Sequence, residues 1–164
     1  MKEIKENTQM LLFRFRDYKN TDFINEHLEI IHKEGYVWML KVGKKTSESK
    51  LQQILNDGGW LILRSPKSDG SKMYIAHFTA FQCEEPGDMV YPTYYSDIIN
   101  QDGDSEYYSE SAVQQWFRLE KIIPLSETTY PCFVLSKTAA AIDDVIKTTR
   151  TAVMFVSNKE KILF

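Results

Sequence analysis

The sequence contains few cysteines and no long apolar run. Its 2 cysteines, Cys83 and Cys132, lie far apart and have no partner at the spacing of a zinc-ligand pair. Small secreted domains depend on a much denser cysteine framework, so we expect two reduced thiols. No apolar stretch reaches the roughly 18–20 residues that cross a bilayer, and residues 1–6 lack the apolar segment of a signal peptide. These absences predict a cytoplasmic protein with no membrane partner.

Glycine and proline are also scarce, with 7 and 5 residues in a chain of 164. This scarcity argues against collagen-like repeats and low-complexity segments, and the 43% hydrophobic and 26% charged residues are ordinary for a globular domain. Neither a GxGxxG fingerprint nor a Walker phosphate loop is present, which argues against a nucleotide cofactor. We expect a folded protein of about one domain, without a cofactor and without enzymatic activity.

Metal-binding patterns are absent as well. The three histidines, His27, His32 and His77, do not have the HExxH spacing, and no cysteine lies close to them in the sequence. Residues 102–106 (DGDSE) resemble the start of a calcium loop, but the twelfth position, which needs a bidentate glutamate, is Val113. We therefore predict no metal site. A hydrogen-bonded structural role is expected for His77, with a general base as the alternative.

Basic residues are missing from one long stretch, Met73 to Phe117. Eight of the 23 acidic residues lie there: Glu84, Glu85, Asp88, Asp97, Asp102, Asp104, Glu106 and Glu110. The net charge of the whole chain is −3, but the rest of the chain has 20 basic residues against the remaining 15 acidic ones. A basic body with an acidic insert is compatible with a nucleic-acid partner, whereas a solvated acidic loop is the simpler interpretation.

Hydrophobic periodicity predicts the elements of the first half of the chain. Alternation of apolar and polar residues predicts a strand over 10–16. Apolar positions three and four residues apart predict a helix over 22–34 that ends at Gly35. Three more elements are expected in this half: a strand over 36–42, a helix from Ser47 to Asn56 and a strand over 60–64.

The second half is predicted to form a hairpin and then a long insert. A turn over 65–71 precedes an apolar segment over 73–81, so this segment is expected to pair with the strand before the turn. Residues 82–111 sustain neither period and are predicted to be a long loop. The remaining expected elements are a strand over 116–123, an apolar piece over 132–135, a helix capped by Ser136 or Thr138, and a last strand over 153–156.

Aromatic and basic residues occur together near the predicted strand ends. Stacking on an aromatic face contributes roughly 1–3 kcal/mol per base. The candidates for a base-binding cage are Trp38, Trp60, Trp116, Tyr94 and Tyr95, and each has a core position as its alternative. The candidates for phosphate contacts, which would otherwise form a solvated surface, are Lys41, Lys44, Lys45, Lys50, Arg64, Lys67 and Lys72.

Five segments follow one another in a recognisable order. They are YVWMLKVGK (36–44), GGWLILRS (58–65), YIAHFTAF (74–81), WFRLEKIIPLS (116–126) and LSKTAAAIDDVIKTTRTAVMFV (135–156). Their order resembles that of the PUA-like superfamily, and in particular its EVE and YTH branch. The resemblance implies an α+β fold, namely a small, partly open mixed β-barrel of the PUA-like type with flanking helices.

The resemblance also implies an organisation and a site. Residues 35–164 would form the PUA-like domain. Residues 1–34 fall outside the resemblance, and we expect them to add a strand and a helix to the barrel edge, within one compact unit. The base-binding residues would be Trp38, Trp60, Ser65, Tyr94, Tyr95 and Gly43. The distribution of basic residues, and not the resemblance, predicts the phosphate-binding residues Lys41, Lys44, Lys45, Arg64 and Lys67.

Members of that branch typically enclose a modified base of RNA or DNA in an aromatic pocket, and some are specificity modules of modification-dependent restriction systems. The leading hypothesis is therefore a non-enzymatic module that recognises a modified, for example methylated, base in DNA or RNA, with an effector protein as a further partner. One alternative is an RNA-processing enzyme that uses Lys41, Tyr74 and His77. Another is a protein-interaction module in which the acidic, Tyr-rich insert over 82–112 binds a basic partner.

Overall fold

The structure, a computed structural model, describes residues 2–100 and 113–164. The α-helices in these residues are α1 (Phe23–Glu34), α2 (Glu48–Asn56), α3 (Tyr95–Ile99) and α4 (Ile142–Thr148). The strands are β1 (Glu3–Ile4), β2 (Gln9–Arg14), β3 (Val37–Gly43), β4 (Trp60–Arg64), β5 (Met73–Gln82), β6 (Val113–Pro124), β7 (Phe133–Leu135), β8 (Val153–Asn158) and β9 (Ile162–Leu163). Two 3-10 helices complete the described elements: η1 (Lys67–Asp69) and η2 (Glu127–Cys132). None of the helices in this part of the chain is long and apolar enough to span a bilayer.

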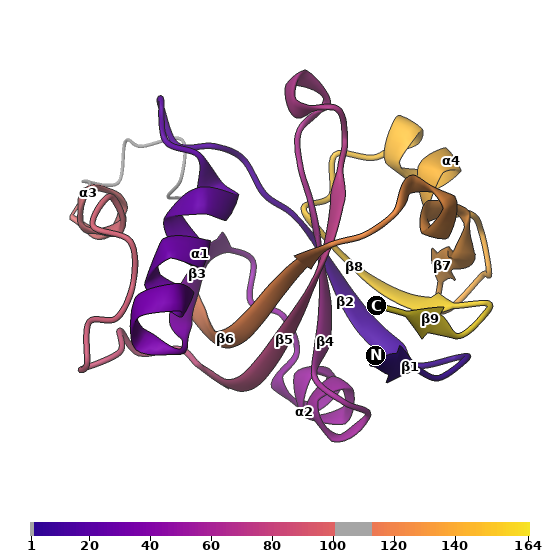
Figure 1. The fold of residues 1–164 in the computed structure, drawn as a ribbon, viewed down its shortest axis with the longest axis horizontal. Helices are drawn as coiled ribbons and strands as arrows, with labels where there is room; N and C mark the ends of the chain where they lie inside the picture. The colour runs from indigo at the N-terminus through magenta and orange to yellow at the C-terminus, as the bar shows by residue number, and fades with distance from the viewer. Residues whose placement is uncertain (1, 101–112) are drawn as a thin grey trace. The chain divides into compact units, whose positions relative to one another are not determined.

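Seven of the described strands form one mixed sheet in the order β3-β6-β5-β4-β2-β8-β7, and β1 pairs with β9 in a separate two-stranded sheet (Figure 1). β2 and β4 are parallel, whereas β2 and β8, β3 and β6, β4 and β5, and β7 and β8 are antiparallel pairs. The large sheet is open, because β3 and β7 are the two ends of its strand order. The expected α+β fold class with an open mixed sheet is confirmed.

The chain divides into two compact units. Unit 1 consists of Met1–Arg16, Gln53–His77 and Ile122–Phe164, and unit 2 consists of Asp17–Gln52 and Phe78–Lys121. Each unit combines segments that are far apart in the sequence, so each depends on long-range strand pairing. β5 and β6 contribute residues to both units.

β2 is an inner strand of unit 1. It pairs in parallel with β4 on one side and antiparallel with β8 on the other. Met10, Leu11 and Leu12 are fully buried, so successive side chains of this strand are covered on both faces. The prediction that the strand of residues 1–34 lies at the barrel edge is wrong. Its partner β8 lies near the other end of the chain, where local periodicity cannot reveal it.

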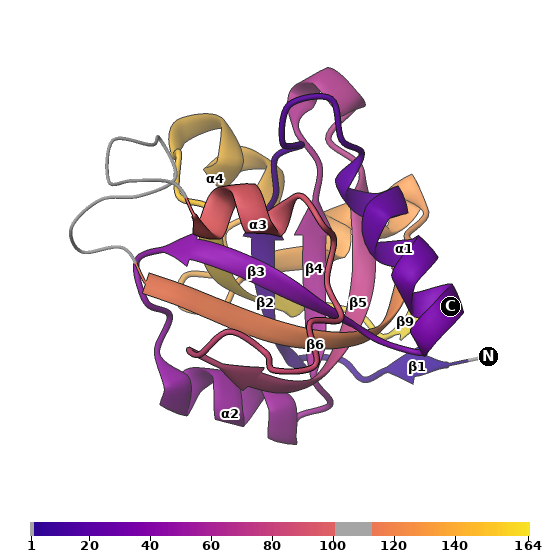
Figure 2. The ribbon, with the colours of Figure 1, turned by 90° about the vertical axis from the view of Figure 1, so that its left-hand side faces the viewer.

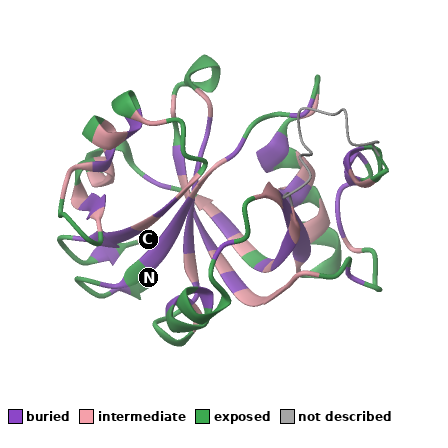
Figure 3. Ribbon diagram, turned by 180° about the vertical axis from the view of Figure 1, so that it is seen from behind, coloured by how far each residue is buried: buried purple, intermediate pink, exposed green. Residues whose placement is uncertain are grey.

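The core of unit 1 is largely aliphatic. Its buried residues are Ile4, Met10, Leu12, Ile62, Met73, Ile75, Leu125, Phe133, Ile142, Ile146, Met154, Val156 and Ile162. Figure 3 shows that buried positions concentrate on the strands. β1 and β9 bring the two chain ends together, since the backbone N–H of Lys2 donates to the carbonyl of Phe164 over 2.8 Å. β8 is therefore not the last strand, and neither β1 nor β9 has enough residues to show a period.

The first helix of unit 2 begins and ends at the predicted residues. Oδ1 of Asp22 accepts a hydrogen bond from the backbone N–H of Asn25 over 3.1 Å, which caps the first turn of α1. Gly35 has a φ of 87°, a conformation that favours glycine, and its N–H donates to the carbonyl of Ile31 over 2.8 Å. The predicted helix over 22–34 is confirmed, and so is the hairpin of β4 and β5.

Aromatic side chains form most of the second core in unit 2. Its buried residues are Tyr18, Trp38, Leu40, Tyr91, Tyr94, Tyr95, Ile98 and Trp116. Three of them lie in or next to α3, which Figure 2 shows beside β3. The prediction of a continuous loop over 82–111 is wrong at α3, because five helical residues are too few to establish a period. Asp102, Asp104, Glu106 and Glu110 of the predicted insert lie outside the described residues.

α4 begins later than the sequence predicts. Its N-cap is Ala141, which offers no side-chain hydrogen bond, so the prediction of Ser136 or Thr138 as the cap is wrong. The backbone N–H of Leu135 donates to the carbonyl of Ala140 over 2.9 Å. Residues 135–140 therefore form a turn that leaves β7, and the helix starts only after this turn.

His27 is buried in unit 2 between two hydrogen-bond partners. Its Nδ1 lies 2.7 Å from the carbonyl oxygen of Phe23, so Nδ1 carries the proton and donates. Its Nε2 then accepts from the hydroxyl of Tyr95 over 2.6 Å. Burial lowers the pKa of His27 to about 4, outweighing the opposite effect of the Phe23 carbonyl. The neutral imidazole thus links α1 to α3.

We expect the protein to lose stability as the pH falls through the range between the unfolded and folded pKa values of His27. The unfolded chain binds the proton near pH 6.5 and the folded chain only near pH 4, so the stabilisation is complete above 6.5. The loss by about pH 4.5 should be about 2–3 kcal/mol. The free energy of unfolding, measured by urea titration at several pH values in this range, tests the prediction. H27Q should remove most of the dependence, whereas H32Q should retain it; an unchanged slope in H27Q would contradict the assignment.

Candidate functional site

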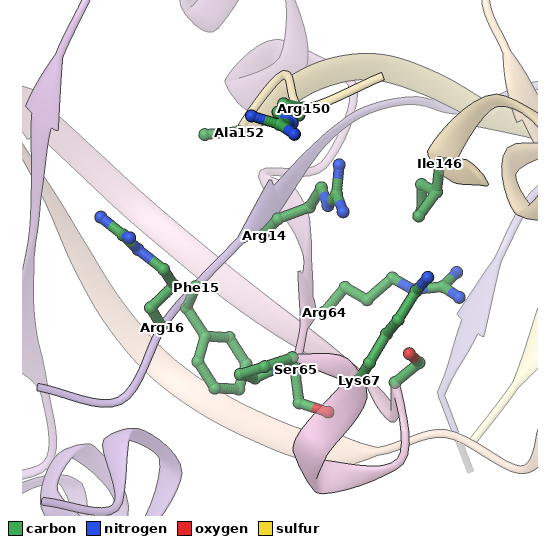
Figure 4. Close-up of a pocket in the computed structure, with 11 residues that line it drawn as sticks. Arg14, Phe15, Arg16, Arg64, Ser65, Lys67, Ile146, Arg150 and Ala152 are labelled. Atoms are coloured by element: carbon green, nitrogen blue, oxygen red, sulfur yellow. The ribbon is translucent and has the colours of Figure 1, made fainter. Parts of the chain in front are cut away.

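A basic cavity of about 480 Å³ lies within unit 1. Its lining consists of Arg14, Phe15, Arg16, Arg64, Ser65, Pro66, Lys67, Ser71, Ile146, Arg150 and Ala152. Five of these described residues are cationic and none is acidic. In Figure 4 the side chains of Arg14, Arg64, Lys67 and Arg150 surround one space, and Arg16 points away from Arg64 and Lys67.

Strand pairing places two of the arginines side by side. Arg14 and Arg64 are the last residues of β2 and β4, and they are partners in the register of this parallel pair. Neighbouring residues in register project to the same face of a sheet, so both guanidinium groups lie on one side. The backbone N–H of Phe15 donates to the carbonyl of Arg64 over 3.1 Å and continues the pairing past the end of β2.

The guanidinium of Arg14 is held by the chain that follows α4. Its Nη1 donates to the carbonyl of Thr149 over 2.9 Å and makes a longer contact of 3.4 Å with the carbonyl of Thr151. The pKa of Arg14 is lowered, first by burial and then by the positive charge of Arg64. Two cations that repel each other at this point favour the binding of an anion.

Arg64 is the most buried of the basic residues that line the cavity, with 9% of its surface exposed. Its Nη1 donates to Oδ1 of Asp143 over 2.8 Å, and Asp143 comes from the first turn of α4. Asp143 thus neutralises Arg64, while Arg14, Lys67 and Arg150 of the lining add positive charge.

The turn between β4 and β5 presents Lys67. Oγ of Ser65 accepts a hydrogen bond from the backbone N–H of Lys72 over 2.7 Å, which closes the base of the turn. Gly70 has a φ of 80°, and its N–H donates to the carbonyl of Lys67 over 3.0 Å. Lys67 and Arg150 are both exposed, and within the described part of the chain neither side chain forms an ion pair or hydrogen bond.

The two units carry opposite charge. Unit 1 has 12 basic and 8 acidic residues, a net charge of +4, whereas unit 2 has 8 basic and 15 acidic residues, a net charge of −7. The net charge of −3 for the chain hides this separation. A locally positive surface attracts anionic ligands even when the whole protein is negative.

Three residues of the sequence-predicted site line the cavity: Arg64, Ser65 and Lys67. The other predicted phosphate ligands lie in unit 2, where Lys41 is buried and its ammonium donates to the carbonyl of Lys44. Burial lowers the pKa of Lys41. Lys44 and Lys45 are exposed, and Lys45 lies 3.6 Å from Glu48. Gly43, the predicted base contact at the end of β3, has a φ of 143°.

The predicted aromatic wall is divided between the units. Trp38, Tyr94 and Tyr95 belong to the core of unit 2, and the indole N–H of Trp38 donates to Asp88 over 3.2 Å. Tyr94 and Tyr95 pack edge to face with ring centroids 4.8 Å apart. Trp60 lies in unit 1 and is half-buried.

The ring of Trp60 is held on three sides by its own unit. Its centroid lies 5.0 Å from that of His77 and 5.3 Å from that of Phe164. A Cβ added at Gly58, which has a φ of 128°, would come within 2.8 Å of the indole nitrogen. Glycine at 58 thus allows the ring to lie against the backbone.

Arg14, Arg16 and Arg150 line the cavity but are not among the site residues predicted from the sequence. For the first two a signal existed, because the alternation over 10–16 predicted a strand with arginines on one face. What it could not supply was the parallel partner that brings Arg64 next to Arg14. Arg150 follows α4 without any local pattern that distinguishes it from a surface residue.

We expect the pair of Arg64 and Asp143 to stabilise unit 1. D143N should lower the free energy of unfolding by about 1 kcal/mol, because it leaves a buried guanidinium without its carboxylate. D144N is the matched control, since Asp144 lies in the same first turn of α4 and is exposed. It should change stability by no more than about 0.5 kcal/mol. Equal losses in a urea titration would show that the helix start, and not the ion pair, is responsible.

No group of three or more His, Cys, Asp or Glu residues in 2–100 and 113–164 is arranged to hold a metal ion. The cavity itself offers guanidinium, ammonium and hydroxyl groups, which are ligands for anions rather than for metal ions.

Comparison with known proteins gives one match. No curated protein and no solved structure matches the chain. The family model described as Pua-like matches residues 11–160, which include most of β2, the basic cavity and most of the predicted N-terminal extension. The boundary predicted at residue 35 stays a prediction. Because the match extends over most of the sequence, the chain belongs to the Pua-like family.

Proposed function

We propose that this protein binds nucleic acid and that the basic cavity of unit 1 holds phosphate groups of the bound strand. Pua-like domains generally bind nucleic acids, which supports this class of partner. The observation that carries the proposal is the convergence of Arg14, Arg64, Lys67 and Arg150 around a cavity with no acidic residue in its lining. Phosphate oxygens are the anionic groups that such an arrangement suits.

The side chains of the cavity suit phosphate groups better than the carboxylates of an acidic protein surface. Arginine presents planar donors that match two phosphate oxygens at once, and two such groups stand in register at the ends of β2 and β4. Lys67 and Arg150 add charge from exposed positions. The positive charge of unit 1 would also accelerate the encounter with a polyanion, more strongly at low salt than at high salt.

We expect K67A and R150A each to weaken binding of a short oligonucleotide. Each loses one phosphate contact, so the slope of log K against log salt concentration should decrease in magnitude by about 1. Fluorescence anisotropy at several salt concentrations measures both quantities. K137A is the matched control, because Lys137 is an exposed lysine of the same unit outside the cavity lining. If K137A reduced affinity and slope as much as K67A, the cavity would not be the phosphate site.

We also propose that Trp60, an aromatic residue of the same unit, binds a modified base. This step rests on the resemblance to the EVE and YTH branch. Among Trp38, Trp60, Tyr94 and Tyr95, Trp60 is the residue that is not buried, and it lies in the unit with the basic cavity. A partly exposed indole can stack on a base, whereas the other three rings are occupied by the core of unit 2.

We expect W60L to lose preference for a methylated oligonucleotide while retaining salt-dependent binding of its unmethylated counterpart. Loss of one stacking face costs roughly 1–3 kcal/mol, which is about fivefold to more than a hundredfold in affinity. Circular dichroism and thermal unfolding establish that the variant folds, since Trp60 also contacts His77 and Phe164. A folded W60L protein that keeps the wild-type preference would remove Trp60 from the base site.

The other functions expected from the sequence stay predictions. An RNA-processing enzyme would need the ammonium of Lys41, which is buried and bonded to the carbonyl of Lys44. A protein-interaction role for the insert concerns residues 82–112, part of which lies outside the described residues. Association with an effector protein in a modification-dependent defence system rests on the resemblance alone.

A further inference from the structure

We propose that the basic cavity binds the phosphorylated end of a nucleic-acid strand, a phosphomonoester, in preference to an internal phosphodiester. The proposal rests on the proposed function and names the part of the nucleic acid that this site recognises. Three observations carry it: the donor groups of the two paired arginines, the excess of positive charge, and the size and composition of the cavity.

The two paired arginines are anchored in a way that leaves one edge of each guanidinium available. Arg14 is held through Nη1 by the carbonyls of Thr149 and Thr151, and Arg64 is held through Nη1 by Asp143. No protein group in the described part of the chain accepts a hydrogen bond from Nε or Nη2 of either residue. The edge formed by Nε and Nη2 is a fork that binds two oxygens of a phosphate. Anchoring through Nη1 therefore orients two forks in advance.

The two arginine forks and two further cations offer more hydrogen-bond donors and more positive charge than one phosphodiester can pair with. A phosphodiester has two non-bridging oxygens and one negative charge, whereas a phosphomonoester has three such oxygens and a charge of about −1.5 to −2 at pH 7. Beside the ion pair of Arg64 and Asp143, Arg14, Lys67 and Arg150 bring further positive charge to the cavity. The third oxygen and the additional charge of a monoester match this excess.

The cavity is also larger than one phosphate group needs. Its volume of about 480 Å³ lies in the range of pockets that hold small organic ligands. Pro66, Ile146 and Ala152 contribute apolar surface beside the cations, where the sugar of a terminal nucleotide can pack. A chain end enters a concave site from one direction, but an internal phosphate requires the strand to leave it in two directions. The cavity therefore favours a terminal nucleotide.

The experiment compares three oligonucleotides of one sequence that carry a 5′-phosphate, a 3′-phosphate or hydroxyl groups at both ends. Dissociation constants are measured by competition against one labelled strand. We expect one phosphorylated end to bind at least about tenfold more tightly than the hydroxyl strand, since it gains charge-assisted hydrogen bonds. The preference should decrease from about pH 7.5 to about pH 5.5, because the monoester then loses its second charge near a pKa of about 6.

Variants connect the preference to the arginine forks. R14K keeps the positive charge but removes the fork, so it should reduce the preference several-fold and more strongly than it reduces binding of the hydroxyl strand. K137A lies outside the cavity and should leave both quantities unchanged. A preference that R14K retains in full would overturn the proposal, because the selectivity would then come from another surface.

The remaining outcomes separate this proposal from the proposed function. Equal binding of all three strands would overturn the end-specific site and leave nucleic-acid binding intact. Absence of binding to every strand would overturn both. A nucleoside 5′-monophosphate that competes at the same concentration as the phosphorylated strand would show a free-nucleotide site and would overturn the strand end as the ligand.

Discussion

The parallel, in-register pairing of β2 with β4 determines the chemistry of unit 1, because it places Arg14 next to Arg64. Adjacent like charges are unfavourable, and the protein offsets them only in part. Asp143 compensates Arg64, and the carbonyls of Thr149 and Thr151 solvate Arg14 without cancelling its charge. Burial and, after it, the remaining repulsion from Arg64 lower the pKa of Arg14. A site that keeps such repulsion in the absence of a ligand is stabilised when an anion binds.

The same pairing explains why the basic residues of the site come from separate parts of the sequence. β2 supplies Arg14, β4 and the following turn supply Arg64 and Lys67, and the chain between α4 and β8 supplies Arg150. Each of these segments belongs to unit 1, whose net charge of +4 is opposite in sign to that of the whole chain. The overall acidic charge is therefore a poor guide to the partner of this protein, and the local distribution of charge decides the question.

Features with local signals could be predicted from the sequence, and features that need distant pairing could not. α1 was predictable because Asp22 and Gly35 mark its two ends, and the hairpin of β4 and β5 was predictable because a polar turn separates two apolar segments. The inner position of β2 depends on a partner near the other end of the chain, and α4 starts after a turn that no capping residue marks. In the candidate site, Arg64, Ser65 and Lys67 were identified because they lie on one hairpin, whereas Arg14 and Arg150 join them only through tertiary structure.

Aromatic and basic residues carry different weight as indicators of function in this chain. The aromatic residues of unit 2 pack against one another. Tyr18 stacks on Tyr94 with centroids 5.7 Å apart, and Trp116 contacts both Tyr91 and Tyr95. Their abundance is explained by burial, since a large ring gains stability from any apolar surroundings. A guanidinium gains no comparable stability from burial, and the donor edges of Arg14 and Arg64 meet no acceptor within the described residues. Burial therefore explains the aromatic residues but not the grouping of cations, so the basic cavity is a stronger indication of function than the aromatic content.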